Sequence, residues 1–369
     1  MLKIDPIISN KPPNETVVVV AMSGGVDSST VAAYLHKIGY KVIGVTLQLY
    51  SGNAKVAKGA CCAGQDIYDA KRVAHTFNFP HYVLNYESLF KQEVIDDFAD
   101  SYLKGQTPIP CVRCNQTVKF RDLLKVSQDL DADALVTGHY VRRVINNNQV
   151  ELHTAKDATK DQSYFLFATT NEQLNFLRFP LGEITKEQTR EIAQSLEIGI
   201  ADKAESQDIC FVGGGSYASI VQKLRPESLQ PGNIVHIDGQ ILGRHQGIIN
   251  YTVGQRRGLK ISSKDPLYVI EIRPNSNEVI VGPKNSLLKD TVYIKNINWI
   301  SRNITNNEKV EVKLRSGQEA VKATIQHAPD MQSATVKLDD AQIGIAPGQA
   351  CVVYDNTIVL GGGWIVSSK

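Results

Sequence analysis

The sequence predicts an α/β protein in which a parallel sheet flanked by helices is followed by two small, mostly β domains. Two observations support this fold class. From about Glu15 to Phe211, short β-rich runs alternate with amphipathic segments, as in β-α-β units. After about Gly213, short strands separated by turn dipeptides replace that pattern. A chain of 369 residues is long enough for two or three such domains.

The N-terminal elements follow from hydrophobic periodicity. Alternating or continuous apolar runs predict strands at 17–20, 41–49, 81–84 and 134–137. Apolar residues at helical spacing predict helices at 28–38, 67–77 and 90–102. Thr185 and Gln188 form a capping box that predicts the start of another helix, which should end near Ile198.

The C-terminal elements are predicted hairpins. The turn dipeptides are Asp238-Gly239, Pro274-Asn275 and Asp355-Asn356, and the strand-like runs are 267–272, 279–281, 309–314, 321–325 and 334–338. Gly282-Pro283 separates two groups of these runs and is the predicted boundary. We therefore expect domains at 1–213, 214–283 and 284–369.

Composition excludes several classes of protein. The chain is 42% hydrophobic and 21% charged, and 40 Lys+Arg against 38 Asp+Glu give a net charge of +2, which is typical of a globular protein. No apolar run approaches the ~18 residues of a membrane span, and the N-terminus lacks the apolar core of a secretory signal. We therefore expect a cytoplasmic protein that has no membrane partner.

The segment Ser23-Gly24-Gly25-Val26-Asp27-Ser28-Ser29 directly follows the first predicted strand and opens a helix. Backbone N–H groups without helical partners and the positive end of the helix dipole meet there, and glycines allow a phosphate to approach. The Gly-Lys-Ser/Thr of a Walker A loop is absent. The segment predicts a phosphate-binding turn of another kind.

The chain has six cysteines, Cys61, Cys62, Cys111, Cys114, Cys210 and Cys351. In a reducing compartment, clustered thiols indicate catalysis or metal binding more often than disulfides. Prolines one residue apart precede Cys114 in TPIPCVRCN, and they predict a stiff, extended loop that presents the thiol. Cys351 lies in an apolar run and should be a core residue, and we favour a structural role for Cys61 and Cys62.

The phosphate-binding segment resembles the SGGxDSS pyrophosphate loop, whose users cleave ATP between the α and β phosphates and form an adenylated intermediate. Several families share that loop. Taken in order, AMSGGVDSS, CCAGQDIYDAKRVA, TPIPCVRCN, TGHY, KDQSYFL, SQDICF, YTVGQRRGL and APGQA closely resemble the bacterial tRNA-specific 2-thiouridylase family. The resemblance implies a Rossmann-like first domain of the adenine nucleotide alpha hydrolase type and a C-terminal β-barrel.

This resemblance implies thiolation of a wobble uridine in tRNA. The uracil C2 oxygen is a poor leaving group and is first adenylated by ATP with Mg²⁺, and a cysteine persulfide then delivers sulfur. By resemblance, Cys114 is the nucleophile and Cys210 carries the persulfide, which a sulfur-donor protein would supply. The implied ATP contacts are Ala21, Met22, Ser23, Gly24, Gly25, Val26, Asp27, Ser28, Leu47 and Gly138, and Asp27 is the implied magnesium partner.

The resemblance also implies the contacts to tRNA, which are Ile109, Pro110, Cys111, His139, Lys160, Asp161, Gln162, Arg315, Ser316 and Gln349. Leu47 replaces a methionine that is common in the family, and Ser316 replaces an expected aromatic residue. Because a net charge of +2 is small for an RNA-binding protein, the positive charge must be clustered. The candidate clusters are Arg142-Arg143, Arg256-Arg257, Lys313 with Arg315, and Lys119 with Arg121.

Cys111 stands where the familiar members have Asp, which leaves an alternative mechanism open. Three thiolates from Cys111, Cys114 and Cys210 could hold a [4Fe–4S] cluster that delivers sulfide, or zinc with a fourth ligand. Two further alternatives are another pyrophosphate-loop synthetase, which would need neither the thiols nor RNA, and a non-catalytic RNA-binding protein of the same fold.

Overall fold

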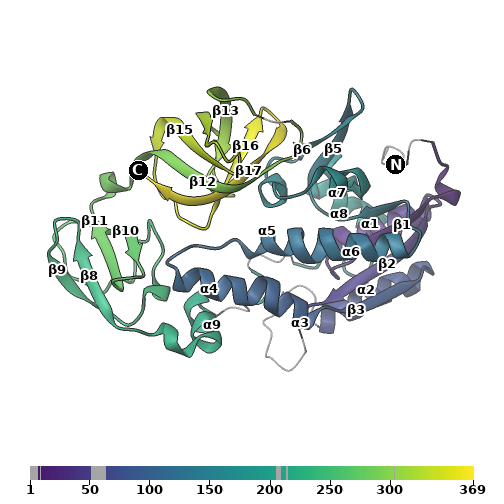
Figure 1. The fold of residues 1–369 in the computed structure, drawn as a ribbon. Coiled ribbons are helices and arrows are strands. Elements are labelled where there is room, and N and C mark those ends of the chain that lie inside the picture. The colour runs from purple at the N-terminus through teal and green to yellow at the C-terminus, as the bar shows by residue number, and fades with distance from the viewer. Residues whose placement is uncertain (1–6, 9, 51–63, 205–208, 213–214, 303) are drawn as a thin grey trace. The chain divides into compact units, whose positions relative to one another are not determined.

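The computed structural model describes residues 7–8, 10–50, 64–204, 209–212, 215–302 and 304–369 (Figure 1). Within these ranges the chain divides into two compact units, which we describe separately. The first unit contains the described residues of 1–93 and 111–214 together with 357–359, and the second contains 94–110, 215–356 and 360–369. Cys61 and Cys62 lie outside the described residues. No helix in the described ranges is long and apolar enough to cross a membrane.

A parallel, five-stranded sheet forms the centre of the first unit. Its order is β3-β2-β1-β4-β7, with bounds β3 (His81–Asn85), β2 (Lys41–Gln48), β1 (Val17–Ala21), β4 (Ala134–Val136) and β7 (Leu177–Arg178). Val18, Val19 and Val20 of β1 are fully buried, because a strand with neighbours on both sides and helices on both faces needs an apolar residue at every position. The four predicted strands and the predicted fold class are confirmed.

The described helices are α1 (Val26–Lys37), α2 (Gly64–Phe77), α3 (Glu87–Phe90), α4 (Asp97–Leu103), α5 (Pro110–Cys114), α6 (Leu123–Asp129), α7 (Asn171–Phe176), α8 (Lys186–Ser195) and α9 (Tyr217–Leu224). The predicted helix 90–102 is interrupted, since the π-helical segment Lys91–Asp96 separates α3 from α4. The capping box of Thr185 and Gln188 is present. The helix it opens ends at Ser195 rather than near Ile198, because Glu197 takes a left-handed conformation with φ 54°.

Sequence analysis did not identify the hairpin of β5 (Val141–Asn146) and β6 (Gln149–Thr154) in the first unit. Its turn residues Asn147 and Asn148 both have positive φ, 49° and 62°, as a two-residue hairpin turn requires. The Asn-Asn pair between two β-rich runs was the available signal. β6 also pairs with Ile358 and Val359 at the start of β17.

Six strands of the second unit close into a barrel. Their order is β12-β15-β14-β13-β16-β17, and β12 also pairs with β17; the bounds are β12 (Lys289–Trp299), β15 (Ser333–Gln342), β14 (Val321–His327), β13 (Glu308–Lys313), β16 (Ala350–Asp355) and β17 (Ile358–Ser368). This confirms the expected C-terminal β-barrel. Cys351 is fully buried in β16, and burial raises the pKa of its thiol to about 12, so its predicted place in the core is confirmed.

A second sheet of this unit has the order β10-β11-β8-β9, with bounds β10 (Tyr268–Arg273), β11 (Glu278–Gly282), β8 (Gly232–His236) and β9 (Ile241–His245). Ile234, Val269 and Val279 form the centre of its apolar core. Tyr251 of the YTVGQRRGL segment packs into the same core and is 7% exposed, so its ring is not available to stack on RNA. Short 3₁₀ turns at Pro226–Ser228, Ile248–Asn250 and Lys284–Leu287 connect these elements.

Candidate active site

The predicted phosphate-binding turn joins β1 to α1 at the carboxyl edge of the parallel sheet. The turn is fixed through its main chain, because the Met22 N–H donates to Val45 O at 2.8 Å and the Thr46 hydroxyl donates to Met22 O at 2.8 Å. Within the turn, the Ser23 N–H donates to Ser28 Oγ at 3.0 Å. The glycines between them are therefore held from both sides.

The N-terminus of α1 is arranged to bind an anion. Gly25 is the N-cap, so no side chain accepts from the N–H groups of the first turn. Gly138 lies directly against this turn, and a Cβ at that position would come within 2.9 Å of Ser28 N. Uncapped N–H groups, the positive end of a 12-residue helix and a neighbour without a side chain fit the phosphates of ATP.

Asp27, the residue predicted to meet magnesium, lies in the first turn of α1. Its Oδ1 accepts from Lys186 Nζ at 2.6 Å and from the Tyr140 hydroxyl at 2.9 Å. Lys186 is 8% exposed, and its ammonium also lies 5.7 Å from the centre of the Tyr140 ring. The structure thus places a buried cation beside the predicted phosphate site, which sequence analysis did not identify.

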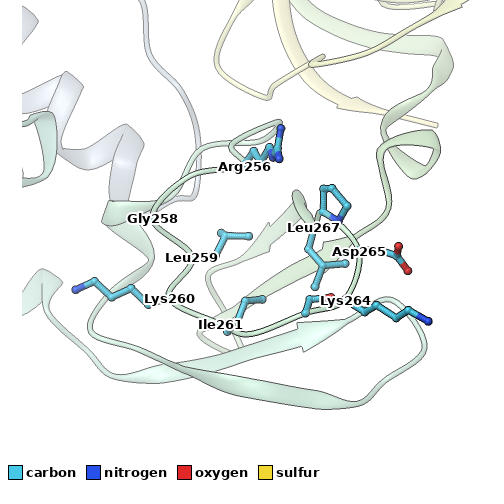
Figure 2. Close-up of a pocket in the computed structure, with 10 residues that line it drawn as sticks. Arg256, Gly258, Leu259, Lys260, Ile261, Lys264, Asp265 and Leu267 are labelled. Carbon is cyan, nitrogen blue, oxygen red and sulfur yellow. The ribbon is translucent and has the colours of Figure 1, made fainter.

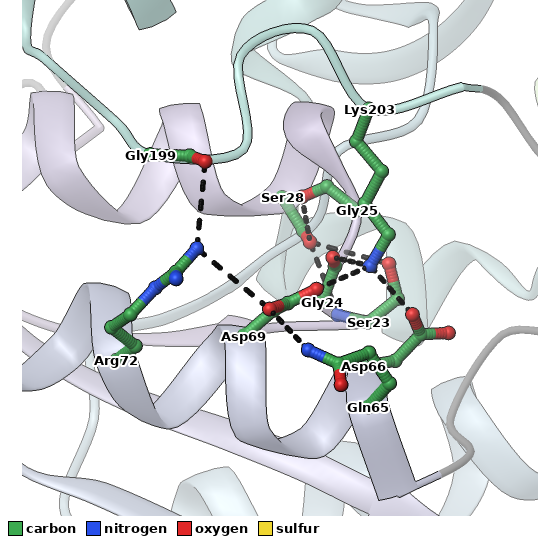
Figure 3. Close-up of polar contacts among 10 residues, drawn as sticks. All are labelled: Ser23, Gly24, Gly25, Ser28, Gln65, Asp66, Asp69, Arg72, Gly199 and Lys203. Atoms are coloured by element: carbon green, nitrogen blue, oxygen red, sulfur yellow. Dashed lines mark hydrogen bonds and ion pairs between the residues drawn. The ribbon is translucent and has the colours of Figure 1, made fainter.

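A second ionic cluster holds the other side of the turn (Figure 3). The Lys203 ammonium donates to Gly24 O at 2.9 Å, Asp66 Oδ1 at 2.6 Å and Asp69 Oδ2 at 2.7 Å, which uses all three of its N–H bonds. Burial opposes the charge of Lys203, but the hydrogen bonds and charges of the two aspartates outweigh it and raise the pKa of Lys203. Lys203 therefore joins the turn to α2.

Gly24 explains why this contact is possible. Its φ is +74°, and a Cβ would lie 2.1 Å from the Asp66 carbonyl oxygen, so the backbones of the turn and of α2 approach each other as only glycine allows. Asp66 and Asp69 lie in the CCAGQDIYDAKRVA segment that carries part of the family resemblance, whereas Lys203 lies three residues before SQDICF, and none of the three was predicted to belong to the ATP site. Because Lys203 is far from Asp66 and Asp69 in sequence, no short sequence pattern predicts that they form a cluster.

Cys114, the predicted nucleophile, is the last residue of α5 and is 8% exposed. The expectation of an extended loop that presents this thiol is wrong. Pro110 takes the first position of a helix, where a missing N–H costs nothing, and the helix continues through Cys114 into the π-helical segment Asn115–Asp122. The fully buried Val112 anchors the same helix.

Polar atoms without partners flank Cys114. Among the described residues, Arg113 Nε, Asn115 Oδ1 and Gln116 Oε1 are buried and accept or donate no hydrogen bond. The amide of Asn115 is oriented, because its Nδ2 donates to Phe165 O at 3.2 Å. Buried atoms of this kind are costly unless a ligand or water meets them. Their position beside the predicted nucleophile, next to a π-helical segment, is typical of a functional site.

Cys210, the predicted persulfide carrier, is half-buried and lies in the same unit. Its Sγ accepts a hydrogen bond from the Tyr50 hydroxyl at 2.6 Å. Cys111 is exposed on α5. In the described part of the chain, no group of three or more His, Cys, Asp or Glu side chains is arranged to hold a metal. The geometry therefore gives no support to a cluster or zinc on Cys111, Cys114 and Cys210.

Three residues of the first unit that are predicted to contact tRNA, His139, Asp161 and Gln162, have partners within the unit. His139 Nδ1 lies 2.8 Å from Thr137 Oγ1, and its ring meets those of Phe120 and Phe179 edge to face. Burial, and then the charge of Lys119, lower the pKa of His139 to about 3, so the ring is neutral near pH 7. A neutral imidazole can form hydrogen bonds but no ion pair with phosphate.

Asp161 and Gln162 stabilise their own loop. Asp161 accepts from Ala155 N–H at 3.0 Å and from the Ser163 hydroxyl at 2.7 Å. Gln162 Oε1 accepts from Tyr140 N–H at 2.9 Å, which links the KDQSYFL segment to TGHY. The neighbouring Lys160 is half-buried.

The remaining predicted contacts belong to the second unit. Gln349 Nε2 donates to Thr107 O at 2.9 Å, and Thr107 N–H donates to Pro347 O at 2.7 Å. A Cβ at Gly348 would lie 3.0 Å from Thr107 N. The APGQA segment thus packs against the chain that precedes α5, where Ile109 and Pro110 are buried.

Arg315 and Ser316 are exposed in the turn that follows β13. The predicted basic clusters differ in their partners. Arg142 and Arg143 donate from Nε to the carbonyl oxygens of Thr154 and Leu174, and Arg121 pairs with Asp122. Arginines of the first unit therefore stabilise its fold.

Arg256 and Arg257 are exposed. Arg256 lies at a pocket of the second unit that is also lined by Lys260, Lys264 and Asp265 (Figure 2). Figure 2 shows the apolar side chains of the pocket in the middle, with the charged ends of Lys260 and Lys264 pointing away from them. Three basic side chains against one carboxylate give this surface a net positive charge, which suits contact with a polyanion.

Together, a parallel sheet, an uncapped helix N-terminus with the SGGVDSS turn and two cysteines in the same unit define a pyrophosphate-loop enzyme. Three family models match the chain. They are described as tRNA methyl transferase HUP domain over residues 16–214, tRNA methyl transferase PRC-barrel domain over 219–283 and Aminomethyltransferase beta-barrel domain over 289–365.

Full-length relatives identify the family. The chain is 57% identical over 367 residues to a tRNA-specific 2-thiouridylase MnmA of Wolbachia pipientis wMel, covering 99% of each protein. It is 55% identical over 370 residues to the protein of the same name from Neorickettsia sennetsu, again covering 99% of each. This chain belongs to the tRNA-specific 2-thiouridylase family, as its motifs predicted.

The similarity of this chain to solved structures is weaker than its similarity to these relatives. A 4-thiouridine synthetase in complex with RNA and bound ATP matches with a TM-score of 0.36 and 16% identity, over 57% of this chain and 50% of that chain. An NMN synthetase from Francisella tularensis matches with a TM-score of 0.35 and 19% identity, over 58% of this chain and 78% of that chain. Both values are too low to bear on function.

Proposed function

We propose that this protein uses ATP to convert the wobble uridine of tRNA to 2-thiouridine, with release of AMP and pyrophosphate. The observation that carries the proposal is the presence, in one compact unit, of an anion-binding helix N-terminus and of Cys114 and Cys210 in the segments the family motifs predict. Relatives with the same name align over 99% of the chain, which supports the same assignment.

In the first step the uracil C2 oxygen attacks the α-phosphorus of ATP, and pyrophosphate leaves. We assign ATP to residues 21–28, Leu47 and Gly138, which surround the uncapped N-terminus of α1. Lys186, held by Asp27, would stabilise the negative charge of the leaving group. Magnesium, assigned to Asp27, would add neutralising charge; a bond to Oδ1 would have to share the oxygen that Lys186 and Tyr140 already contact.

In the second step the terminal sulfur of a Cys210 persulfide attacks C2, and AMP leaves with the former C2 oxygen. The Cys114 thiolate then attacks Sγ of Cys210, which breaks the S–S bond. The electron pair of that bond stays with the sulfur on C2, giving 2-thiouridine, and the two cysteines are oxidised to a disulfide. A dithiol reductant must reduce this disulfide before the next turnover. Since the described thiols form no metal site, we derive no step through a cluster.

We propose that tRNA is the macromolecular substrate and that a separate persulfide-bearing protein supplies the sulfur, in the cytoplasm. We keep Ile109, Pro110, Cys111, His139, Lys160, Asp161, Gln162, Arg315, Ser316 and Gln349 as the proposed tRNA contacts, within domains 1–213, 214–283 and 284–369. Within this set the exposed Arg315 and Ser316 suit phosphate contacts, and outside it the pocket that Arg256, Lys260 and Lys264 line suits them as well.

The test is incubation of the purified protein with ATP, Mg²⁺, a sulfur donor and unmodified tRNA, followed by mass spectrometry of the nucleosides. We expect 2-thiouridine at the wobble position and AMP and pyrophosphate in equal amounts. A synthetase of another substrate would release pyrophosphate without tRNA, and a binding protein would release none. Since two matching family models are described by methyl transfer, the same spectrum also checks for methylated uridine, which would contradict the proposal.

A further inference from the structure

The Tyr50 hydroxyl and the Cys210 sulfur form a contact that neither the motifs nor the comparisons assign. Tyr50 lies just after β2, and its oxygen donates to Cys210 Sγ at 2.6 Å. The two residues are 160 positions apart in sequence and belong to the same unit. A phenol O–H is a hydrogen-bond donor, and a sulfur anion can only accept, so this contact suits a thiolate.

Aromatic packing fixes both partners of this contact. The Tyr50 ring meets the ring of Phe90 edge to face at 5.3 Å between centres, and Phe90 meets Phe211 at 6.1 Å in the same way. Phe90 is fully buried, and Phe211 is the residue after Cys210. The hydroxyl and the sulfur are therefore held by one row of three rings rather than by a flexible side chain.

We propose that Tyr50 is a further catalytic residue, whose hydroxyl stabilises the thiolate of Cys210 while that residue accepts sulfur from its donor. This inference rests on the proposed function. In the step concerned, the Cys210 thiolate attacks the outer sulfur of a donor persulfide, a new S–S bond forms on Cys210, and the donor's S–S bond breaks to release the donor thiolate. No net oxidation occurs, because one S–S bond replaces another.

The physical reason is that a hydrogen bond to the charged form of an acid favours that form. The thiolate, not the thiol, is the nucleophile, so a donor fixed at the sulfur increases the fraction that can react near pH 7. Cys210 is half-buried, and burial has the opposite effect on a charged sulfur, so a donor held at the sulfur matters more than it would in water. Phenylalanine at position 50 would keep the ring row and remove only this donor.

The experiment compares wild type with Tyr50→Phe in the full-length protein, without tRNA or ATP. The rate of iodoacetamide alkylation at Cys210 is followed by peptide mass spectrometry as a function of pH. We expect the midpoint of the Cys210 profile to rise by at least about half a pH unit, so that alkylation near pH 7 is about threefold slower. The exposed Cys111 is the internal reference and should not change.

Tyr82→Phe is the matched control, because Tyr82 lies on β3 in the same unit and is 50% exposed. An unchanged Cys210 profile in Tyr50→Phe, at an unchanged melting temperature, would overturn the proposal. So would an equal shift in Tyr82→Phe. Persulfide loading of Cys210 from a low-molecular-weight persulfide should slow in parallel with alkylation. These measurements need no tRNA, so failure of the thiolation assay would refute the proposed function without touching this result.

Discussion

The proposed ATP-binding turn and the segments that hold Cys114 and Cys210 belong to the same unit, but they are stabilised by different interactions. Around the turn, Lys203 and Lys186 each pair with aspartates, and every donor of Lys203 is used. At Cys210 the sulfur contacts the Tyr50 phenol, whose ring packs on Phe90, and beside Cys114 the buried atoms Arg113 Nε, Asn115 Oδ1 and Gln116 Oε1 have no partner among the described residues. A site that binds a fixed polyanion can be built in advance, whereas a site that exchanges sulfur must leave groups for its substrates to meet.

The largest expected effect is the loss of thiolation without loss of pyrophosphate release, which would separate the cysteine region from the turn. Cys114→Ser and Cys210→Ser should each lower thiolation by at least about 10³-fold, because the nucleophile or the carrier is lost. Both variants should keep ATP-dependent pyrophosphate release, measured with unmodified tRNA. Cys351→Ser is the control and should thiolate at nearly the wild-type rate, since that residue is fully buried in the barrel. Loss of pyrophosphate release in both cysteine variants would show that the regions are not separable.

The second-largest expected effect is a loss of pyrophosphate release that leaves the cysteines unchanged. Gly138→Ala places a Cβ 2.9 Å from Ser28 N and 3.2 Å from Asp27, so the first turn of α1 must shift away from the phosphates. We expect pyrophosphate release to fall about 100-fold, while alkylation of Cys210 stays unchanged. Gly64→Ala is the control, because a Cβ there meets nothing within 4 Å. Equal activity of both variants would remove Gly138 from the ATP site.

A smaller effect is expected when the charge of Lys203 is removed. Lys203→Met leaves Asp66 and Asp69 without their common cation and frees the Gly24 carbonyl, so the turn should lose its fixed position. Lys203 acts as a positioning residue, and we expect the KM for ATP to rise about tenfold with a smaller change in kcat. Lys203→Arg should recover part of that loss.

Lys71→Met provides the control for this change, since Lys71 is exposed on the same helix α2 as Asp66 and Asp69. If kcat and KM respond equally to Lys203→Met and Lys71→Met, the cluster has no specific role in holding the turn.

The smallest expected effect is a loss of folding stability at acid pH. The Thr46 hydroxyl donates to Met22 O and therefore accepts from His81 Nε2 at 2.8 Å, which leaves Nδ1 buried and without a partner in the described chain. Burial, and then the charge of Lys71, lower the pKa of His81 from 6.5 to about 4. The unfolded chain therefore binds more protons between these values, and stability should fall as the pH drops from about 6.5 to 4.

We expect a loss of about 2 kcal/mol over this range, measured as the pH dependence of unfolding by urea. His81→Gln should flatten that dependence, while His75→Gln, at an exposed position of α2, should not. An unchanged slope in His81→Gln would mean that other groups cause the acid sensitivity.

Local patterns were reliable where one segment decides its own structure. The valine run of β1, the capping box at Thr185 and the SGGVDSS turn all form as predicted, because helix starts, strands and tight turns depend on neighbouring residues. The prediction for Cys114 failed because prolines are compatible both with an extended loop and with the first turn of a helix. Burial of Val112 against the rest of the unit favours the helix.

The sequence by itself determined the fold class, the family and which thiols and which turn carry the proposed chemistry. Only the tertiary structure decided which side chains contact them: Lys203 at the turn, Lys186 at Asp27, and Tyr50 at Cys210. The reason is physical. Motifs follow from backbone geometry over a few residues, whereas a hydrogen bond between residues 160 positions apart exists only after the whole unit has folded.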